Sequence, residues 1–324
     1  MYKTILTLAA FLSFNHLYSQ ISYKVNQDNP FLKVHVGVGG FFDYDFLDKN
    51  SRSATNAILQ FHPSKRIMLG GEVVWANKKN DKVIKESATE IKATMFEWNG
   101  RLSLFPSAKV KSKQVKIVLE SASWSDYSYN YSYENYIFAP AKTLYQYGFT
   151  FSAGSFTNNF LDSKNDSLLL LVNKTSGLDE YLPNTGTTYT GMRFSAGVVY
   201  SETRNFSIDA KDKRTGNVYG DKVNRGRTEF IAEIVAMPTI TVTKDLVAKE
   251  TGTEYTLKTM PELKNIGYRI RLEQYSTGVL ALGYHIEFGQ RPGILYRFGK
   301  KEQLRTMYFK IGISAFINGM KSKI

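Results

Sequence analysis

The chain has 324 residues, no cysteine, a formal net charge of +13 and an aromatic content of 14%. Without cysteine it has no disulfide framework, no thiolate nucleophile and no cysteine for lipid attachment. Its many aromatic residues favour pleated, half-buried surfaces, and Tyr suits a membrane interface because its ring is apolar and its hydroxyl is polar.

The first twenty residues have the order of a secretory signal peptide. Lys3 precedes an apolar stretch from Ile5 to Phe14, and Tyr18-Ser19-Gln20 follows. This apolar stretch of roughly ten residues is shorter than the ~20 that a spanning helix needs, so we expect cleavage after Ser19. Residues 1–19 are predicted to be the signal peptide and residues 20–324 one exported domain.

Strands with one apolar and one polar face are predicted along the rest of the chain, because apolar residues recur at every second position. Many runs reach the ~9 to 11 residues that a tilted strand needs to cross a bilayer, more than the ~5 to 6 common in soluble sandwiches. We therefore expect an all-β, antiparallel transmembrane barrel. The runs lie at 32–38, 57–62, 67–75, 96–104, 115–120, 145–153, 192–200, 229–234, 266–273, 280–288 and 307–317.

The connections between these runs differ in length. The gaps near 42–55, 77–90 and 125–143 are long, and those at 63–65 and 106–114 are shorter. Outer-membrane barrels have long outer loops and short periplasmic turns, so 106–114 is interpreted as a periplasmic turn and 125–143 as an outer loop. Because segments 168–172, 239–247 and 253–260 are ambiguous, the expected count is about 14 strands, with about 12 or 16 as alternatives.

Both ends of the exported chain carry recognisable features. The Tyr18-Ser19-Gln20 junction leaves a mature N-terminal Gln, and aromatic hairpins recur over nearly the whole mature chain. The last run, from Lys310 to Ile317, is similar to the C-terminal signal read by the barrel-assembly machinery, although the chain continues to Ile324 instead of ending on an aromatic residue. With these features the chain resembles the outer-membrane β-barrels of Bacteroidota-type bacteria, which implies the outer membrane of a Gram-negative cell.

Charged residues occupy the polar face of several predicted strands. A charge in mid-strand is costly in lipid, so this face is expected to point into the lumen. Because both signs occur, the side chains could line a selective pore or pair and fill a narrow barrel, and we favour pairing. The predicted lumen-facing charges are Arg101, Glu120, Arg193, Glu229, Glu233, Arg269, Arg271, Glu273, His285, Glu287 and Arg297, with Lys116 and Lys310 on the same faces.

A row of alternating tyrosines between 125 and 136 is the most unusual local feature of the sequence. Such rings offer a large contact area to a sugar or a protein at a small entropic cost. We predict an exposed contact loop, with an extension of the barrel lip through the interface belt as the alternative. The contact residues would be Tyr127, Tyr129, Tyr131, Tyr133 and Tyr136.

The sequence offers few residues for catalysis or metal binding. Beyond the signal peptide the histidines are His35 and His285, on lumen-facing positions of distant strands, and His62, expected in a turn. A nucleophile system needs a Ser, a His and an orienting group, which a barrel could still bring together across its lumen. No strand has zinc-ligand spacing. We therefore expect no catalytic residue, metal or cofactor.

Two basic clusters account for much of the net charge. One lies on the predicted periplasmic turn and the other flanks a predicted outer loop. Near a membrane, the phosphate-bearing groups of outer-membrane lipid or lipopolysaccharide are the expected partners, whereas export argues against nucleic acid. The clusters are Lys109, Lys111, Lys113 and Lys116, and Lys211, Lys213, Arg214, Lys222, Arg225 and Arg227.

Three functions are compatible with the sequence. The first is an accessory or structural subunit of an outer-membrane assembly with a charge-filled lumen and protein partners. The second is a channel or transporter for small solutes. The third is a barrel enzyme that modifies lipid or lipopolysaccharide. We prefer the first because of the mixed-charge lumen and the tyrosine-rich segment.

Overall fold

The structure is a computed structural model that describes most of the chain after residue 20. Residues 1–19, the expected signal peptide, lie outside the described residues, as does Tyr127. Within the described ranges, no helix is long and apolar enough to cross a membrane. These ranges are 21–27, 32–45, 50–78, 88–90, 95–126, 129–161, 169–182, 185–213, 216–258, 262–276, 280–295, 297–298, 301–302 and 307–321.

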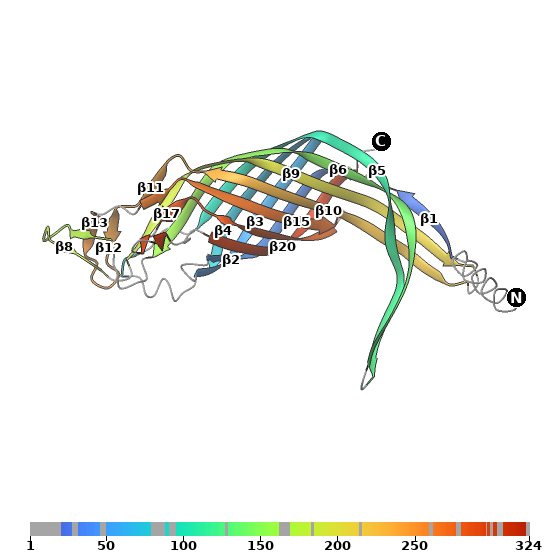
Figure 1. Ribbon diagram of the computed structural model, residues 1–324. Helices are drawn as coiled ribbons and strands as arrows, with labels where there is room; N and C mark the ends of the chain where they lie inside the picture. Colours follow the sequence, from blue (N-terminus) through green and yellow to red (C-terminus); the bar gives the residue numbers. More distant parts are fainter. Residues whose placement is uncertain are drawn as a thin grey trace.

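A closed antiparallel barrel forms the centre of the molecule (Figure 1). Each barrel strand pairs with the next one along the chain, and β20 pairs with β2 to close the circuit. The strands are β2 (Leu32–Asp45), β3 (Asn50–Ser64), β4 (Ile67–Lys78), β5 (Phe96–Asp126), β6 (Tyr129–Leu161), β9 (Gly186–Asp212), β10 (Val218–Ala236), β15 (Ile266–Ser276), β16 (Leu280–Gln290) and β20 (Met307–Lys321).

The all-β, antiparallel barrel is confirmed, and within the described residues its circuit has ten strands instead of about 14. One reason is that the predicted runs 96–104 and 115–120 both belong to β5. A β-bulge between Leu104 and Ser107 accommodates Pro106, a residue that strands tolerate at bulges. The expected turn at 106–114 is therefore wrong.

The ambiguous segments form short strands outside this circuit. A separate small sheet contains β7 (Leu171–Asn173), β8 (Asp179–Glu180), β12 (Asp245–Val247) and β13 (Glu254–Leu257). The remaining short strands are β11 (Ile240–Val242), which pairs with β9, β14 (Glu262–Lys264), which pairs with β17 (Gly293–Leu295), and β18 (Arg297–Phe298), which pairs with β19 (Lys301–Glu302).

The two ends of the barrel differ in their connections. We call the end with Leu32 and Lys321 the terminal end and the opposite one the loop end. Connections at the terminal end are short, at 65–66, 127–128, 213–217 and 277–279. Most of those at the loop end are longer, and the small sheet of β7, β8, β12 and β13 lies there (Figure 1).

Strands β5 and β6 continue past the barrel at the terminal end as a hairpin, which we call the arm (residues 105–145). Figure 1 shows the two strands leaving the wall together and curving away. From Leu104 to Asp126 the strand extends roughly 70 Å at about 3.3 Å per residue. Because the arm leaves the same end as the 65–66 connection, the assignment of 125–143 to the opposite, outer side is wrong.

An apolar core outside the barrel interior packs at the base of the arm. Side chains of β5 and β6 pack against β9, and β1 (Ile21–Gln27) pairs with β9 where β6 separates from it. The Nε2 of Gln27 donates to the carbonyl of Pro140 at 2.9 Å. The buried residues of this core are Val115, Ile117, Leu119, Ala139, Ala141, Phe206, Ile208 and Ala210.

Alternation along the barrel strands separates an apolar outer face from a polar inner face, as period two requires. Phe149 is 53% exposed on the outside, whereas its neighbour Thr150 is fully buried inside. A wall this apolar facing water would be very costly, whereas it suits lipid. Other exposed apolar residues of the wall include Val38, Leu59, Trp98, Phe151, Val198, Ile234, Leu282, Ile313 and Ile317.

We expect Phe149→Arg to destabilise the folded barrel in lipid by about 2 to 4 kcal/mol, because it places a charge within the apolar wall. Phe149→Leu should have a much smaller effect because it keeps the side chain apolar. Urea titrations in phospholipid vesicles, followed by tryptophan fluorescence, compare the two variants. Equal destabilisation by both would contradict a lipid-facing Phe149.

Candidate functional site

The interior of the barrel contains a network of ion pairs. Seven cationic and seven anionic side chains take part among the described residues, so the interior has no large net charge of one sign. The most exposed of these side chains, Glu72, is 15% exposed. The members are Arg101, Arg193, Arg227, Arg269, Arg271, Arg291 and Lys310, with Asp43, Glu72, Glu97, Glu229, Glu233, Glu273 and Glu287.

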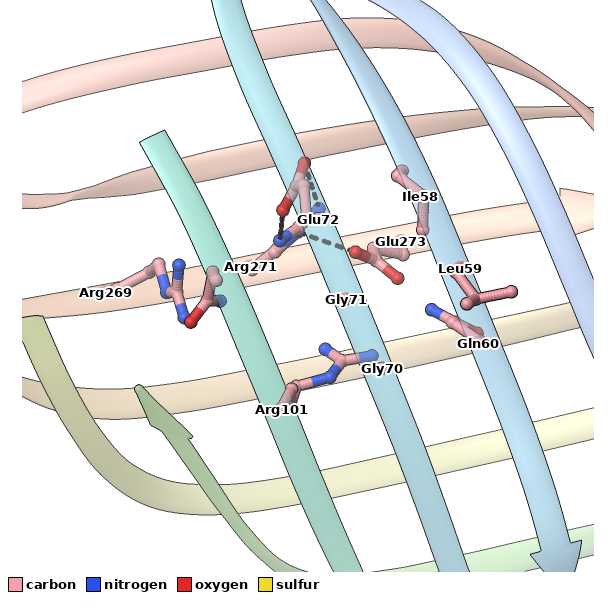
Figure 2. A pocket seen from close by; sticks show the side chains of 11 residues that line it. Ile58, Leu59, Gln60, Gly70, Gly71, Glu72, Arg101, Arg269, Arg271 and Glu273 are labelled. Carbon is pink, nitrogen blue, oxygen red and sulfur yellow. Dashed lines mark hydrogen bonds and ion pairs between the residues drawn. The ribbon is translucent and has the colours of Figure 1, made fainter. Parts of the chain in front are cut away.

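Arg271 lies at the centre of the network, close to carboxylates of β4, β15 and β16. Figure 2 shows it between two of them, Glu72 and Glu273. Its Nη1 is 2.8 Å from Oε2 of Glu72, and its Nε is 2.6 Å from Oε1 of Glu273. A third carboxylate, that of Glu287, is 3.8 Å from Nε. Such a buried guanidinium needs these partners because an uncompensated charge in a dry interior is very costly.

A second group lies closer to the terminal end and is centred on Glu229. This fully buried carboxylate is 2.8 Å from Nη2 of Arg101 and 2.6 Å from Nη2 of Arg227. The Nη1 of Arg227 is also 3.1 Å from Nε2 of His62. Glu229 therefore compensates two arginines from β5 and β10.

Further pairs continue the network towards the loop end. Glu97 pairs with Arg193 and lies 3.6 Å from Nζ of Lys310, while Arg269 donates to Glu233. Arg291 pairs with Asp43 at 2.6 Å, and its guanidinium stacks 3.9 Å from the ring of Tyr308. The Tyr308 hydroxyl donates to Glu287 at 2.7 Å, which links this part to the centre.

Side chains fill the space between these charges. Two interior cavities, one lined by Glu72 and Arg271 and the other by Arg193 and Lys310, measure about 20 Å³ each. That is room for about one water molecule. A Cβ added at Gly37 would lie 2.5 Å from the ring of Phe316. The barrel cross-section is thus packed at these positions.

The interior contains nine of the eleven charges predicted from the sequence to face the lumen. These are Arg101, Arg193, Glu229, Glu233, Arg269, Arg271, Glu273, His285 and Glu287. Glu120 does not lie inside: it is exposed on the arm, as is Lys116, which pairs with Glu134. At this point β5 has left the barrel wall, and its buried face packs in the core at the base of the arm. Arg297 lies on β18, and its side chain lies outside what the structure describes.

Sequence reasoning left five charged residues of the network without a site role. Glu72 and Glu97 lie on faces that alternation had already marked as polar, and that signal could have identified them. Arg227 was placed beside an outer loop but is buried at the terminal end. Asp43 follows the Gly39-Gly40 break in alternation, and Arg291 follows the end of β16. No simple pattern marked these last two.

The three histidines of the exported chain are all buried in the interior. His62 belongs to β3, so its expected turn position is wrong. Its ring centroid lies 6.0 Å from that of His35, whereas His285 lies beside Phe41 at 5.9 Å. Within the part of the chain that the structure describes, no group of three or more His, Asp or Glu side chains could hold a metal ion.

The predicted contact tyrosines lie on the outer part of the arm. Tyr129, Tyr131, Tyr133 and Tyr136 are each at least 40% exposed. The ring of Tyr131 stacks on Trp124 with a centroid distance of 5.7 Å. By alternation, the tyrosines at 129, 131 and 133 share the face of β6 that is buried further along at Ala139 and Ala141.

Comparison with known proteins identifies no family. No family model matches the chain. No curated protein matches it either.

Several solved structures are distantly similar to this chain. A bacterial polysaccharide outer membrane secretin has 8% identity, covers 89% of this chain and 99% of its own, and has a TM-score of 0.22. LpxR from Salmonella typhimurium has 5% identity, coverages of 87% and 100%, and a TM-score of 0.30. OmpT, an outer membrane protein of Vibrio cholerae, has 9% identity, coverages of 92% and 98%, and a TM-score of 0.20. Scores of this size carry no argument about role, and the barrel assignment comes from the strand pairing of the chain itself.

We expect Glu229→Gln to destabilise the barrel by about 3 to 5 kcal/mol, because it leaves Arg101 and Arg227 with less buried negative charge. Glu120→Gln, the same chemical change on the exposed arm, should alter stability by no more than about 0.5 kcal/mol. Urea unfolding in vesicles measures both free energies. Similar values for the two variants would show that the interior pairs do not stabilise the fold.

Proposed function

We propose that the protein is an integral outer-membrane barrel that conducts no solute and serves as a structural subunit presenting the arm to a partner. The arm is the observation that carries this proposal. It extends far beyond any length needed to cross a bilayer, and its surface is rich in exposed aromatic residues.

The apolar outer wall supports the membrane location. Its residues lie around the barrel on successive strands, from Val38 on β2 to Ile313 on β20. Short connections at one end and longer ones at the other fit a terminal end in the periplasm and a loop end outside the cell. On the basis of the sequence, the proposal includes export directed by a signal peptide at residues 1–19 and a barrel of the Bacteroidota type.

The interior supports a structural role over transport. A selective pore uses rings of one charge sign around a water-filled path. Here the charges are balanced, paired and buried. A buried apolar cluster packs at the loop end of the barrel. It includes Phe156, Leu171, Tyr189 and Met237.

The arm supports contact with another protein. From Ser107 onward, β5 is paired on one side with β6, and in the described residues its other edge has no strand partner. Such an edge can accept an added strand through main-chain hydrogen bonds, and neighbouring aromatic side chains can supply contact area. Trp124, Tyr129, Tyr131 and Tyr133 lie near this edge on the paired strands.

We expect the refolded protein to show no single-channel steps in planar lipid bilayers, because side chains fill its interior. The double variant Glu72→Ala and Arg271→Ala keeps the net charge but empties the centre of the network, and should raise the ion leak. Heat-modifiable gel mobility identifies folded samples of both. Steady steps from the folded native protein would contradict a closed lumen.

We expect the triple change of Tyr129, Tyr131 and Tyr133 to Ser to leave barrel assembly intact, because the rings are exposed, and to reduce recovery of a crosslinked partner. Crosslinking in intact cells, followed by gentle detergent extraction, measures recovery. The control is Leu178→Ser with Tyr181→Ser, which removes exposed apolar groups at the loop end.

Two results would contradict the contact role. If the triple variant failed to assemble, the tyrosines would belong to the folding core. If it assembled and retained all crosslinked products, the arm would have no contact role at these residues.

A further inference from the structure

An open hollow lies where the arm leaves the barrel wall. It measures about 410 Å³, within the ~300 to 1,000 Å³ typical of small-molecule sites. The bulge at Pro106 and the separation of β6 from β9, which are paired only from Thr143 onward, place the hollow where the arm leaves the wall. Its lining is basic and hydroxyl-rich: Ser107, Lys109, Lys111, Ser112, Lys113, Tyr145 and Tyr147.

The lysines of this hollow have no acidic partner among the described residues. Lys116, three residues beyond Lys113 along β5, does not line the hollow and pairs with Glu134. The nearest acid on the neighbouring strand is Glu202, opposite Tyr145. Its carboxylate already accepts from Arg204 at 2.7 Å and from the Tyr200 hydroxyl at 3.0 Å. The hollow therefore keeps an excess of positive charge.

The hollow adjoins the apolar wall. Tyr147 is 52% exposed and lies two residues before Phe149 and four before Phe151 on the outer face of β6. At about 3.3 Å per residue, Phe149 lies roughly 7 Å along the strand from Tyr147. The ring of Tyr147 also packs against Tyr200, with centroids 4.8 Å apart. Aromatic residues with polar tips at this level are typical of the boundary between acyl chains and headgroups.

We propose that this hollow binds the phosphate-bearing headgroup of an anionic lipid in the leaflet at the terminal end. Lys109, Lys111 and Lys113 supply the positive charge, and the hydroxyls of Ser107 and Tyr145 can donate to phosphate oxygens. The acyl chains lie along Phe149 and Phe151. A lipid fits better than a soluble anion because the basic hollow and the apolar wall are continuous. This inference rests on the proposed membrane location of the barrel.

The test compares lipid binding by the native full chain and by three variants of it. Native mass spectrometry of detergent-purified protein measures retention of phosphatidylglycerol against phosphatidylcholine. Changing Lys109, Lys111 and Lys113 together to Gln should weaken phosphatidylglycerol binding roughly a hundredfold, since each basic residue near an anionic surface contributes about fivefold. The same lysines changed to Arg should retain binding. The control changes Lys244, Lys249 and Lys258 to Gln, an equal loss of charge at the loop end.

Heat-modifiable mobility confirms folding, and Lys111→Gln alone provides a milder variant with the same direction of change. Equal phosphatidylglycerol binding by the hollow and control variants would overturn the proposal. Displacement of the bound lipid by an excess of inorganic phosphate would also overturn the proposal, because the hollow would then be a general anion site. If the native protein floats with phosphatidylcholine vesicles but shows no preference for phosphatidylglycerol, the headgroup site fails while the membrane location stands. Failure to float with any vesicle would refute the location itself.

Discussion

Compensation of buried charge is the constraint on which the packing of this barrel depends. An arginine or glutamate removed from water costs several kcal/mol unless a partner of opposite sign is placed within a few ångströms. Here Arg271 contacts carboxylates of β4, β15 and β16, and Glu229 contacts arginines of β5 and β10. Two of these contacts, Arg271 with Glu72 and Glu229 with Arg101, join strands that are distant along the chain. The network therefore specifies which strands face one another across the interior, in addition to the main-chain pairing around the wall.

The same compensation explains why the interior can be narrow. Ten strands enclose a space that side chains can span, and long Arg and Glu residues reach across it. Small residues provide the room where large ones meet. At Gly312 an added Cβ would lie 2.4 Å from the His285 ring. A wider barrel with these residues would hold water between the charges, and their pairing would be weaker.

Alternation in the sequence was sufficient to predict most of the wall, because burial on one face imposes a strict period of two. It correctly separated Phe149 from Thr150 and placed Glu233 and Arg269 on inward positions. It failed at Pro106, where a proline and a run of lysines resemble a turn. The strand continues there because the bulge needs no amide hydrogen from Pro106. That single error placed the tyrosine segment at the wrong end and Glu120 inside the barrel instead of on the arm. Partners within the network could not be predicted either, since they depend on contacts between strands that are distant in sequence.

The unpaired edge of β5 has a consequence for the chain before and after it reaches a membrane. A long, flat strand edge is a template for aggregation, because its free amide and carbonyl groups can pair with any exposed strand. Lys109, Lys111 and Lys113 lie on this edge strand, followed by Lys116. Two copies brought together at these edges would oppose like charges, which destabilises the pairing. The lysines can thus protect the arm from self-association while leaving its edge open to a strand of opposite charge.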